Sequence, residues 1–194
     1  TLLARLVAVM ALADRVRPQA AKAVRLLAAM GAETVMLTGD APKAAAATAA
    51  RIGLTEVRAQ ASPEDKINEI KRLQSHGRVV AMVGDGVNDG PALAQADLGV
   101  AMGGGTDVAM TAAGLGLMRD DPLLVPAALQ LARATRRKIV GNLVWAFGFN
   151  AVMIPLAAAG ALSPVLAAAM MSASSLIVVG NAMLLQRWRP DVTL

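Results

Sequence analysis

The stretch with the clearest chemistry is Gly-Asp-Gly-Val-Asn-Asp at residues 84–89, directly after the apolar run 79–83. Such a run predicts a buried strand, and the loop after it carries two carboxylates and an amide. Oxygen ligands of this kind favour Mg²⁺, so Asp85 and Asp89 are candidate magnesium ligands. Asn88 is a candidate donor to a phosphoryl oxygen. The alternative is a solvated turn, in which Asp, Asn and Gly are common.

Two further segments offer groups for the same phosphate. Thr38 supplies a hydroxyl, and Gly39 lets the backbone approach an anion just ahead of a predicted helix, whose amino end favours negative charge. Asp40 is expected to orient a partner group rather than to contact phosphate. Lys66 offers a point charge near the start of another helix. Together these groups would neutralise a transferring phosphoryl group. Taken singly, a turn and a solvated lysine remain the alternatives.

The elements that must position these residues alternate along the chain. Short β-branched or aliphatic runs predict strands at residues 6–12, 34–37, 57–59, 79–83, 98–101 and 115–117. Amphipathic stretches predict helices at residues 19–30, 43–52, 64–75, 91–95 and 107–113. This order favours an α/β fold with a parallel sheet and helices on both faces.

Helix boundaries and the polar loops agree with that fold. Pro18 and Pro63 suit first helical positions, and Ser62 with Asp65 predicts a capping pair. In a parallel sheet, ligand sites collect at the carboxyl ends of the strands. The loops at Asp14, 38–40 and 85–89 all follow predicted strands, so we expect them to converge.

The last third of the chain predicts a membrane hairpin. The chain has 194 residues, of which 56% are hydrophobic and 17% charged, and residues 139–162 and 163–186 contain no charged side chain. Each stretch exceeds the roughly 20 residues that a membrane-spanning helix needs. Two buried core helices are the alternative, but too few residues remain to enclose them. Basic residues flank both outer ends, which predicts that these ends are cytoplasmic; they are Arg133, Arg136, Arg137, Lys138, Arg187 and Arg189.

Composition excludes several classes of partner and site. The formal charge of +5 is concentrated beside the predicted hairpin, where anionic lipid headgroups would attract it, so it does not require a nucleic acid. Aromatic residues make up only 2% of the chain, too few for base stacking. The chain contains no cysteine, which excludes disulfides and thiolate ligands within it. It starts without Met and is interpreted as a fragment.

Four motifs resemble the later part of the phosphorylation domain of P-type ATPases, in order and spacing. They are residues 14–18 (Asp-Arg-Val-Arg-Pro), 38–40 (Thr-Gly-Asp), 63–66 (Pro-Glu-Asp-Lys) and 84–93. The resemblance implies a haloacid-dehalogenase-like fold, the use of ATP and Mg²⁺, and an aspartyl phosphate whose aspartate lies upstream of residue 1. Gly90 departs from the usual Ala. On this basis residues 1–121 are the phosphorylation domain, 122–138 a basic connector helix, 139–186 two transmembrane helices and 187–194 a cytoplasmic tail.

Polar residues inside the predicted spans are candidates for an ion path. Met171 and Ser175 are four residues apart and share a helix face, and a soft thioether prefers Cu(I). The two spans resemble the last two helices of the Cu(I)-exporting branch of heavy-metal P-type ATPases, in which a Tyr-Asn pair, a Met and a Ser line the path. These roles carry over to Asn150, Met171 and Ser175. Phe149 replaces the Tyr, which puts one coordination contact in doubt.

The leading hypothesis is therefore the carboxyl-terminal part of a Cu(I)-exporting P-type ATPase in the cell membrane, with Ag(I) as a further cargo. A zinc or cadmium pump is the first alternative, although the Lys and Asp that this branch places in these helices are absent. A non-catalytic, membrane-tethered binding module is the second. ATP, the monovalent copper ion and the lipid bilayer are the expected partners, and the resemblance leaves a copper chaperone open.

Overall fold

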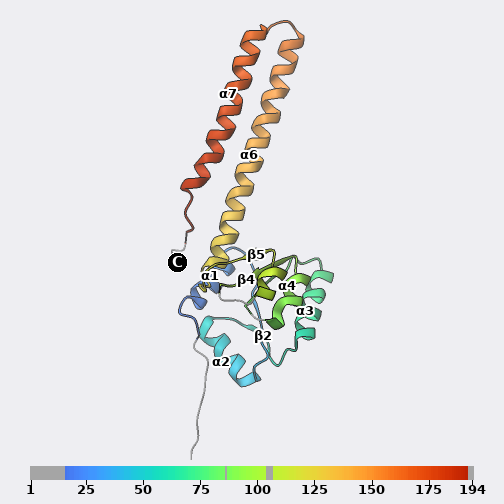
Figure 1. Ribbon diagram of the computed structural model, residues 1–194, viewed down its shortest axis with the longest axis vertical. Coiled ribbons are helices and arrows are strands. Elements are labelled where there is room, and N and C mark those ends of the chain that lie inside the picture. Colours follow the sequence, from blue (N-terminus) through green and yellow to red (C-terminus); the bar gives the residue numbers. More distant parts are fainter. Residues whose placement is uncertain (1–15, 86, 104–106, 192–194) are drawn as a thin grey trace, which may run out of the picture. The chain divides into compact units, whose positions relative to one another are not determined.

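The computed structural model describes residues 16–85, 87–103 and 107–191, and the chain divides into two compact units, Thr1–Leu123 and Leu124–Leu194 (Figure 1). Asp14 and the strand predicted at residues 6–12 lie outside the described residues. Each unit is described by itself.

The first unit alternates helices and strands, as the sequence predicts. Its elements are α1 (Ala20–Ala29), β1 (Val35–Leu37), α2 (Pro42–Ile52), β2 (Glu56–Arg58), α3 (Pro63–Ser75), β3 (Ala81–Gly84), η1 (Val87–Asp89), α4 (Gly90–Gln95), β4 (Leu98–Ala101), α5 (Asp107–Ala112) and β5 (Leu115–Gly116). Their bounds differ from the predicted ones by a few residues at most. The predicted α/β class with parallel strands is confirmed.

Every strand pair in this unit is parallel, but the described strands form two sheets. β1 pairs with β2, and a second sheet has the order β3-β4-β5. The carboxyl ends of β3 and β4 align, with Gly84 opposite Ala101. Polar loops that follow β1 and β3 therefore come from the ends of strands in different sheets.

Local signals explain where the helices begin and end. Ser62 caps α3: its Oγ accepts a hydrogen bond from the Asp65 backbone N–H at 3.1 Å, while Asp65 accepts one from the Ser62 backbone N–H at 2.9 Å. This is the predicted capping pair, with Pro63 in the first turn. Pro18 does not start α1 as predicted, because α1 begins at Ala20 after a turn that contains Pro18.

The core of the first unit is small and lies around α4. Leu93 and Ala101 are almost fully buried, and Met82 and Met110 pack against them. A Cβ on Gly99 would lie 2.5 Å from the carbonyl oxygen of Leu93, so only glycine lets β4 approach α4 this closely. This packing fixes β3 and β4 against the short helix that follows the 84–89 loop.

The second unit is a pair of long helices, α6 (Leu124–Ala158) and α7 (Pro164–Met183), followed by η2 (Leu184–Arg187) (Figure 1). The residues predicted as a connector and those predicted as the first span belong to one continuous helix. Within the described residues, two helices are long and apolar enough to cross a membrane. Large apolar side chains on both are exposed, as lipid contact requires; Ile154 is 66% exposed and Leu176 72%. The structure therefore agrees with the predicted transmembrane hairpin.

Candidate functional site

The centre of the candidate phosphoryl site is an ion pair between Lys66 on α3 and Asp89 at the end of η1. Lys66 Nζ donates to Asp89 Oδ1 at 2.7 Å, and both side chains are only 15% exposed. A charge-assisted hydrogen bond of this length is among the stronger kinds in proteins. The sequence predicted both residues as site residues, and the structure brings these two together.

The end of β3 shapes this pair through Gly84. A Cβ at this position would lie 2.9 Å from both Cβ and Oδ2 of Asp89, closer than side chains normally approach. The φ angle of Gly84 is not in the left-handed region, so space rather than backbone conformation requires the glycine. The missing side chain lets the loop turn back and aim the Asp89 carboxylate at Lys66.

Asp85 is held by a residue that the sequence analysis did not select. Arg17 Nη2 donates to Asp85 Oδ2 at 3.2 Å, and the same guanidinium contacts both carboxylate oxygens of Asp120, at 2.8 and 3.1 Å. Partial burial lowers the pKa of Arg17, but its hydrogen bonds to Asp85 and Asp120 and their charges outweigh this effect and raise it. The guanidinium therefore stays charged and ties the 84–89 loop to residues far along the chain.

Arg17 lies inside the motif at residues 14–18, but no role was assigned to it. Its partner Asp120 is 103 residues away in sequence, and nothing local indicates that contact. The available signal was electrostatic: two carboxylates in one loop favour a nearby cation.

The Thr38-Gly39-Asp40 loop is fixed against the segment after β2. Thr38 Oγ1 accepts a hydrogen bond from the Asp40 backbone N–H at 3.1 Å, and the Thr38 carbonyl accepts one from the Ala61 backbone N–H at 2.9 Å. The Asp40 carbonyl accepts another from the Gln60 N–H. In the described part of the chain, no hydrogen bond or ion pair joins this loop to Lys66, Asp85 or Asp89. Convergence of all three segments on one phosphate thus stays a prediction.

The two carboxylates fit a hard divalent cation by the chemistry of their atoms. Asp89 bonds Lys66 through Oδ1 and Asp85 bonds Arg17 through Oδ2, so each has a second oxygen that makes no hydrogen bond to the described residues. Asn88 is exposed, and its side chain has no hydrogen bond there either. Oxygen donors of this kind suit Mg²⁺. The metal roles of Asp85 and Asp89 and the phosphate role of Asn88 remain predictions.

Several polar residues of the hairpin pair with one another between α6 and α7. Asn181 donates to Asn142 Oδ1 at 2.6 Å and accepts from Lys138 Nζ at 2.6 Å, while Trp145 Nε1 donates to Ser174 Oγ at 3.1 Å. Such bonds stabilise helix association in lipid. We therefore assign these residues to helix packing.

The predicted ion ligands form a different set. Ser175 Oγ donates to the Met171 carbonyl at 3.1 Å, which places the two residues on one face of α7, and Met171 is 69% exposed. Asn150 on α6 is exposed and Phe149 is half-buried. Within the described residues, Asn150 forms no side-chain hydrogen bond with Met171 or Ser175. Their joint role as ligands stays a prediction.

Comparison with known proteins places this geometry in context. Residues 1–97 match the family of haloacid dehalogenase-like hydrolases. The chain is 54% identical over 180 residues to a protein of Mycobacterium tuberculosis named copper-exporting P-type ATPase, covering 93% of this chain and 24% of that protein. A protein of Mycobacterium leprae with the same name is also 54% identical, with 93% and 23% covered.

The fold of this chain is also similar to that of a solved structure. The crystal structure of a zinc-transporting PIB-type ATPase in its E2.Pi state is similar with a TM-score of 0.83 at 39% identity, over 89% of this chain and 28% of that one. The chain thus spans about a quarter of the length of the relatives that it matches.

Proposed function

This chain belongs to the haloacid dehalogenase-like hydrolase family. From its site residues and its similarity to copper-exporting relatives, we propose that it is the carboxyl-terminal part of an ATP-driven, Cu(I)-exporting P-type ATPase. The observation that carries the proposal is the Lys66–Asp89 pair, formed by the loop that also contains Asp85, in a chain that continues into an apolar hairpin with Met171 and Ser175. A phosphoryl site and a soft-ion face in one polypeptide are the two parts that such a pump must couple.

In the proposed phosphoryl step, the chain supplies charge and position rather than the nucleophile. Lys66 holds Asp89 and provides positive charge for phosphoryl oxygens, while Arg17 fixes Asp85. Thr38, Gly39 and Asn88 donate to the phosphate, and Asp40 orients the loop through its own hydrogen bonds. Mg²⁺ bound by Asp85 and Asp89 would neutralise negative charge on the group being transferred.

The nucleophile of this proposal is an aspartate outside the chain. Among the described strands β3 pairs only with β4, and β1 only with β2. Apolar side chains near the start and end of β3 are open, with Val79 90% and Val83 39% exposed. Because the other edge of β3 has no partner among the described strands, a further strand from the rest of the protein could pair there and bring the phosphorylated aspartate to this loop.

Neutral, soft donors favour Cu(I) as the transported substrate. Residues 139–186 contain no acidic side chain, and the described residues hold no cluster of three His, Asp or Glu that would bind a divalent ion. Met171 supplies a thioether, and Ser175 and Asn150 supply weak oxygen donors. The zinc-transporting relative shares the fold, so the choice of ion rests on these donors and on the names of the copper-exporting relatives.

The proposal includes the membrane topology and the domain boundaries. Residues 1–121 form part of the phosphorylation domain, the basic connector at 122–138 and the spans at 139–186 follow, and residues 187–194 are a tail. Both outer ends of the hairpin are cytoplasmic, because six cationic side chains flank them. ATP and the lipid bilayer are partners in this scheme, and a copper chaperone is the proposed donor of the ion.

The test uses the complete protein in vesicles and measures ATP hydrolysis with Cu(I), Ag(I), Zn(II) or Cd(II). We expect stimulation by the monovalent ions, and Met171→Leu should reduce it by about tenfold or more. Met170→Leu is the matched control, because the same side chain is removed one position away on another face of α7. Stimulation by Zn(II) and Cd(II) alone would reject the copper assignment. No ATP hydrolysis under any condition would favour the binding-module alternative.

A further inference from the structure

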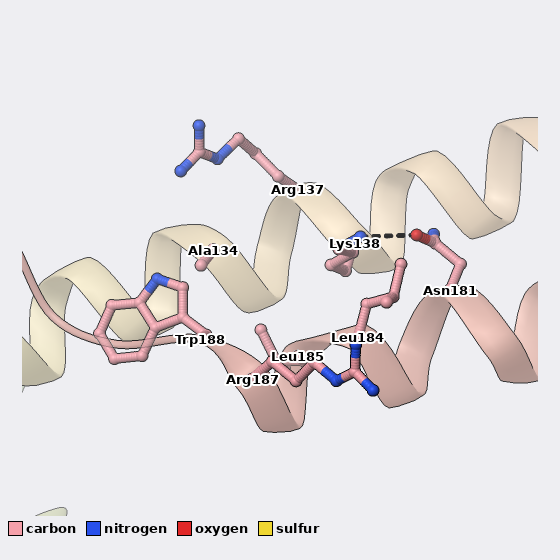
Figure 2. Close-up of a pocket in the computed structure, with 8 residues that line it drawn as sticks. All are labelled: Ala134, Arg137, Lys138, Asn181, Leu184, Leu185, Arg187 and Trp188. Atoms are coloured by element: carbon pink, nitrogen blue, oxygen red, sulfur yellow. Dashed lines mark hydrogen bonds between the residues drawn. The ribbon is translucent and has the colours of Figure 1, made fainter.

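The strongest unassigned feature is a cavity of about 530 Å³ between α6 and the end of the hairpin. It is lined by Ala134, Arg137 and Lys138 on α6, and by Asn181, Leu184, Leu185, Arg187 and Trp188 on α7, η2 and the segment after η2 (Figure 2). Its volume falls within the range of about 300–1,000 Å³ that small-molecule sites occupy. Neither the phosphoryl chemistry nor the ion path uses these residues.

All the charged side chains that line this cavity are basic. Arg137, Lys138 and Arg187 line it, and no acidic side chain does. In the whole of residues 124–191 only Asp191 is acidic, against six Lys and Arg. Within the described residues, the guanidinium groups of Arg137 and Arg187 form no ion pair or side-chain hydrogen bond. Two cations are therefore available to an anionic ligand.

The cavity combines a fixed positive charge with apolar walls, which suits a ligand that has both an anionic and an apolar part. The Lys138 ammonium is held by a 2.6 Å hydrogen bond to Asn181 (Figure 2). Asn181 itself bonds Asn142, so the charge of Lys138 is positioned before any ligand arrives. Leu184, Leu185 and the half-buried Trp188 add apolar walls. Tryptophan with basic residues is typical of the headgroup level of a membrane protein.

The position along the helices is also that of a headgroup. The uncharged part of α6 begins at Ile139 and runs to Ala158, about 30 Å of helix, which equals the hydrocarbon thickness of a bilayer. The cavity residues lie just outside that stretch, at the charged end of both helices. A free anion would use the cations but not the apolar walls, whereas a phospholipid uses both.

We propose that this cavity binds the phosphate headgroup of an anionic phospholipid. Arg137, Lys138 and Arg187 contact the phosphate, and the acyl chains leave past Leu184 and Leu185 into the bilayer. The site would fix the end of the hairpin at the membrane surface. The proposal rests on the membrane placement of the hairpin and is independent of which ion the protein transports.

The test measures lipid retention by the complete protein in nanodiscs of phosphatidylcholine with added phosphatidylglycerol, by native mass spectrometry. Each direct hydrogen bond from a cation to the bound phosphate contributes at least about 1 kcal/mol, or roughly fivefold in affinity. Arg137→Gln combined with Arg187→Gln should therefore lower phosphatidylglycerol affinity about 25-fold. Arg136→Gln is the matched control, since it removes the same charge from α6 outside the cavity, and it should change affinity by less than about twofold.

A second variant keeps every charge. Ala134→Leu places bulk in the cavity, and it should reduce phosphatidylglycerol retention while phosphatidylcholine retention stays unchanged. Circular dichroism confirms that each variant keeps its helices. Equal losses in the Arg137, Arg187 and Arg136 variants would show only general surface attraction and overturn the proposal. Full retention in the Ala134 variant would also overturn it, as would displacement of phosphatidylglycerol by millimolar inorganic phosphate.

Discussion

Replacing Gly84 with alanine tests the reasoning about the phosphoryl site, because it adds one methyl group and changes no charge. The new Cβ would lie 2.9 Å from Asp89 Cβ, whereas ordinary contacts begin at 3.4 Å, so the two must separate by about 0.5 Å. Asp89 Cβ is attached to the backbone, and a rotamer change alone does not relieve the clash with it. The shift would lengthen the 2.7 Å contact between Lys66 and Asp89.

The expected cost follows from that displacement. A misplacement of 1 Å in a catalytic group costs on the order of 10²-fold in rate, so about 0.5 Å should cost at least roughly tenfold. Overpacking of this kind also destabilises a domain by about 1–3 kcal/mol. We therefore expect Gly84→Ala to lower the rate of phosphorylation by ATP in the complete protein by about 10- to 100-fold, with a lowered melting temperature.

The assay is single-turnover phosphorylation by labelled ATP at saturating Mg²⁺, with thermal unfolding measured in parallel. Gly114→Ala is the control, because its Cβ would have no neighbour nearer than 3.8 Å and its φ is not in the left-handed region. It should leave the rate within about twofold of the parent. A Gly84→Ala protein that phosphorylates at the parent rate would refute the argument that this glycine positions Asp89.

Three further predictions concern the same unit. Lys66→Met should lower phosphorylation about 10²- to 10³-fold by removing a positive charge from the site, while Lys71→Met on the exposed face of α3 should leave it unchanged, as labelled ATP would show. Ser62→Ala should lower the free energy of unfolding by about 1 kcal/mol through loss of the cap, measured in urea; an unchanged midpoint would contradict this. The backbone N–H of Val80 donates to Asp97 and lowers the pKa of that carboxyl. The hydrogen bond to the ionised Asp97 carboxylate therefore stabilises the fold above the unfolded-state pKa of about 3.9, and this stabilisation disappears as the pH falls through the lower pKa of the folded state. Asp97→Asn should thus weaken the dependence of the free energy of unfolding on pH between about pH 4 and 2.

The local part of the fold could be predicted because its signals are local. Ser62 and Pro63 mark the start of α3, so the helix that carries Lys66 was identified from the sequence. The division of the strands into two sheets was not predictable in this way. Strand pairing depends on residues far apart in sequence, and alternation predicts only that strands exist.

The same distinction applies to the site. Asp85 and Asp89 lie four residues apart in one loop, so both could be selected as candidate site residues from their spacing. Arg17 could not be assigned, because its role depends on Asp120, 103 residues later. Trp145 is a similar case, because its hydrogen-bond partner Ser174 lies 29 residues later on the other helix.

The hydrogen bonds between α6 and α7 also bear on the predicted ion path, because they fix the register of the hairpin. Lys138 contacts Asn181, and Trp145 contacts Ser174. Moving seven residues toward the carboxyl end of α6 therefore corresponds to moving seven residues toward the amino end of α7, as in an antiparallel pair. Continued to Asn150, this register puts it level with residue 169, about two residues or 3 Å along the axis from Met171. An antiparallel pair therefore brings an amide and a thioether to the same depth of the bilayer, although they lie 21 positions apart in the chain. Equal depth is what a shared ion site requires, and it does not follow from the composition of either helix alone.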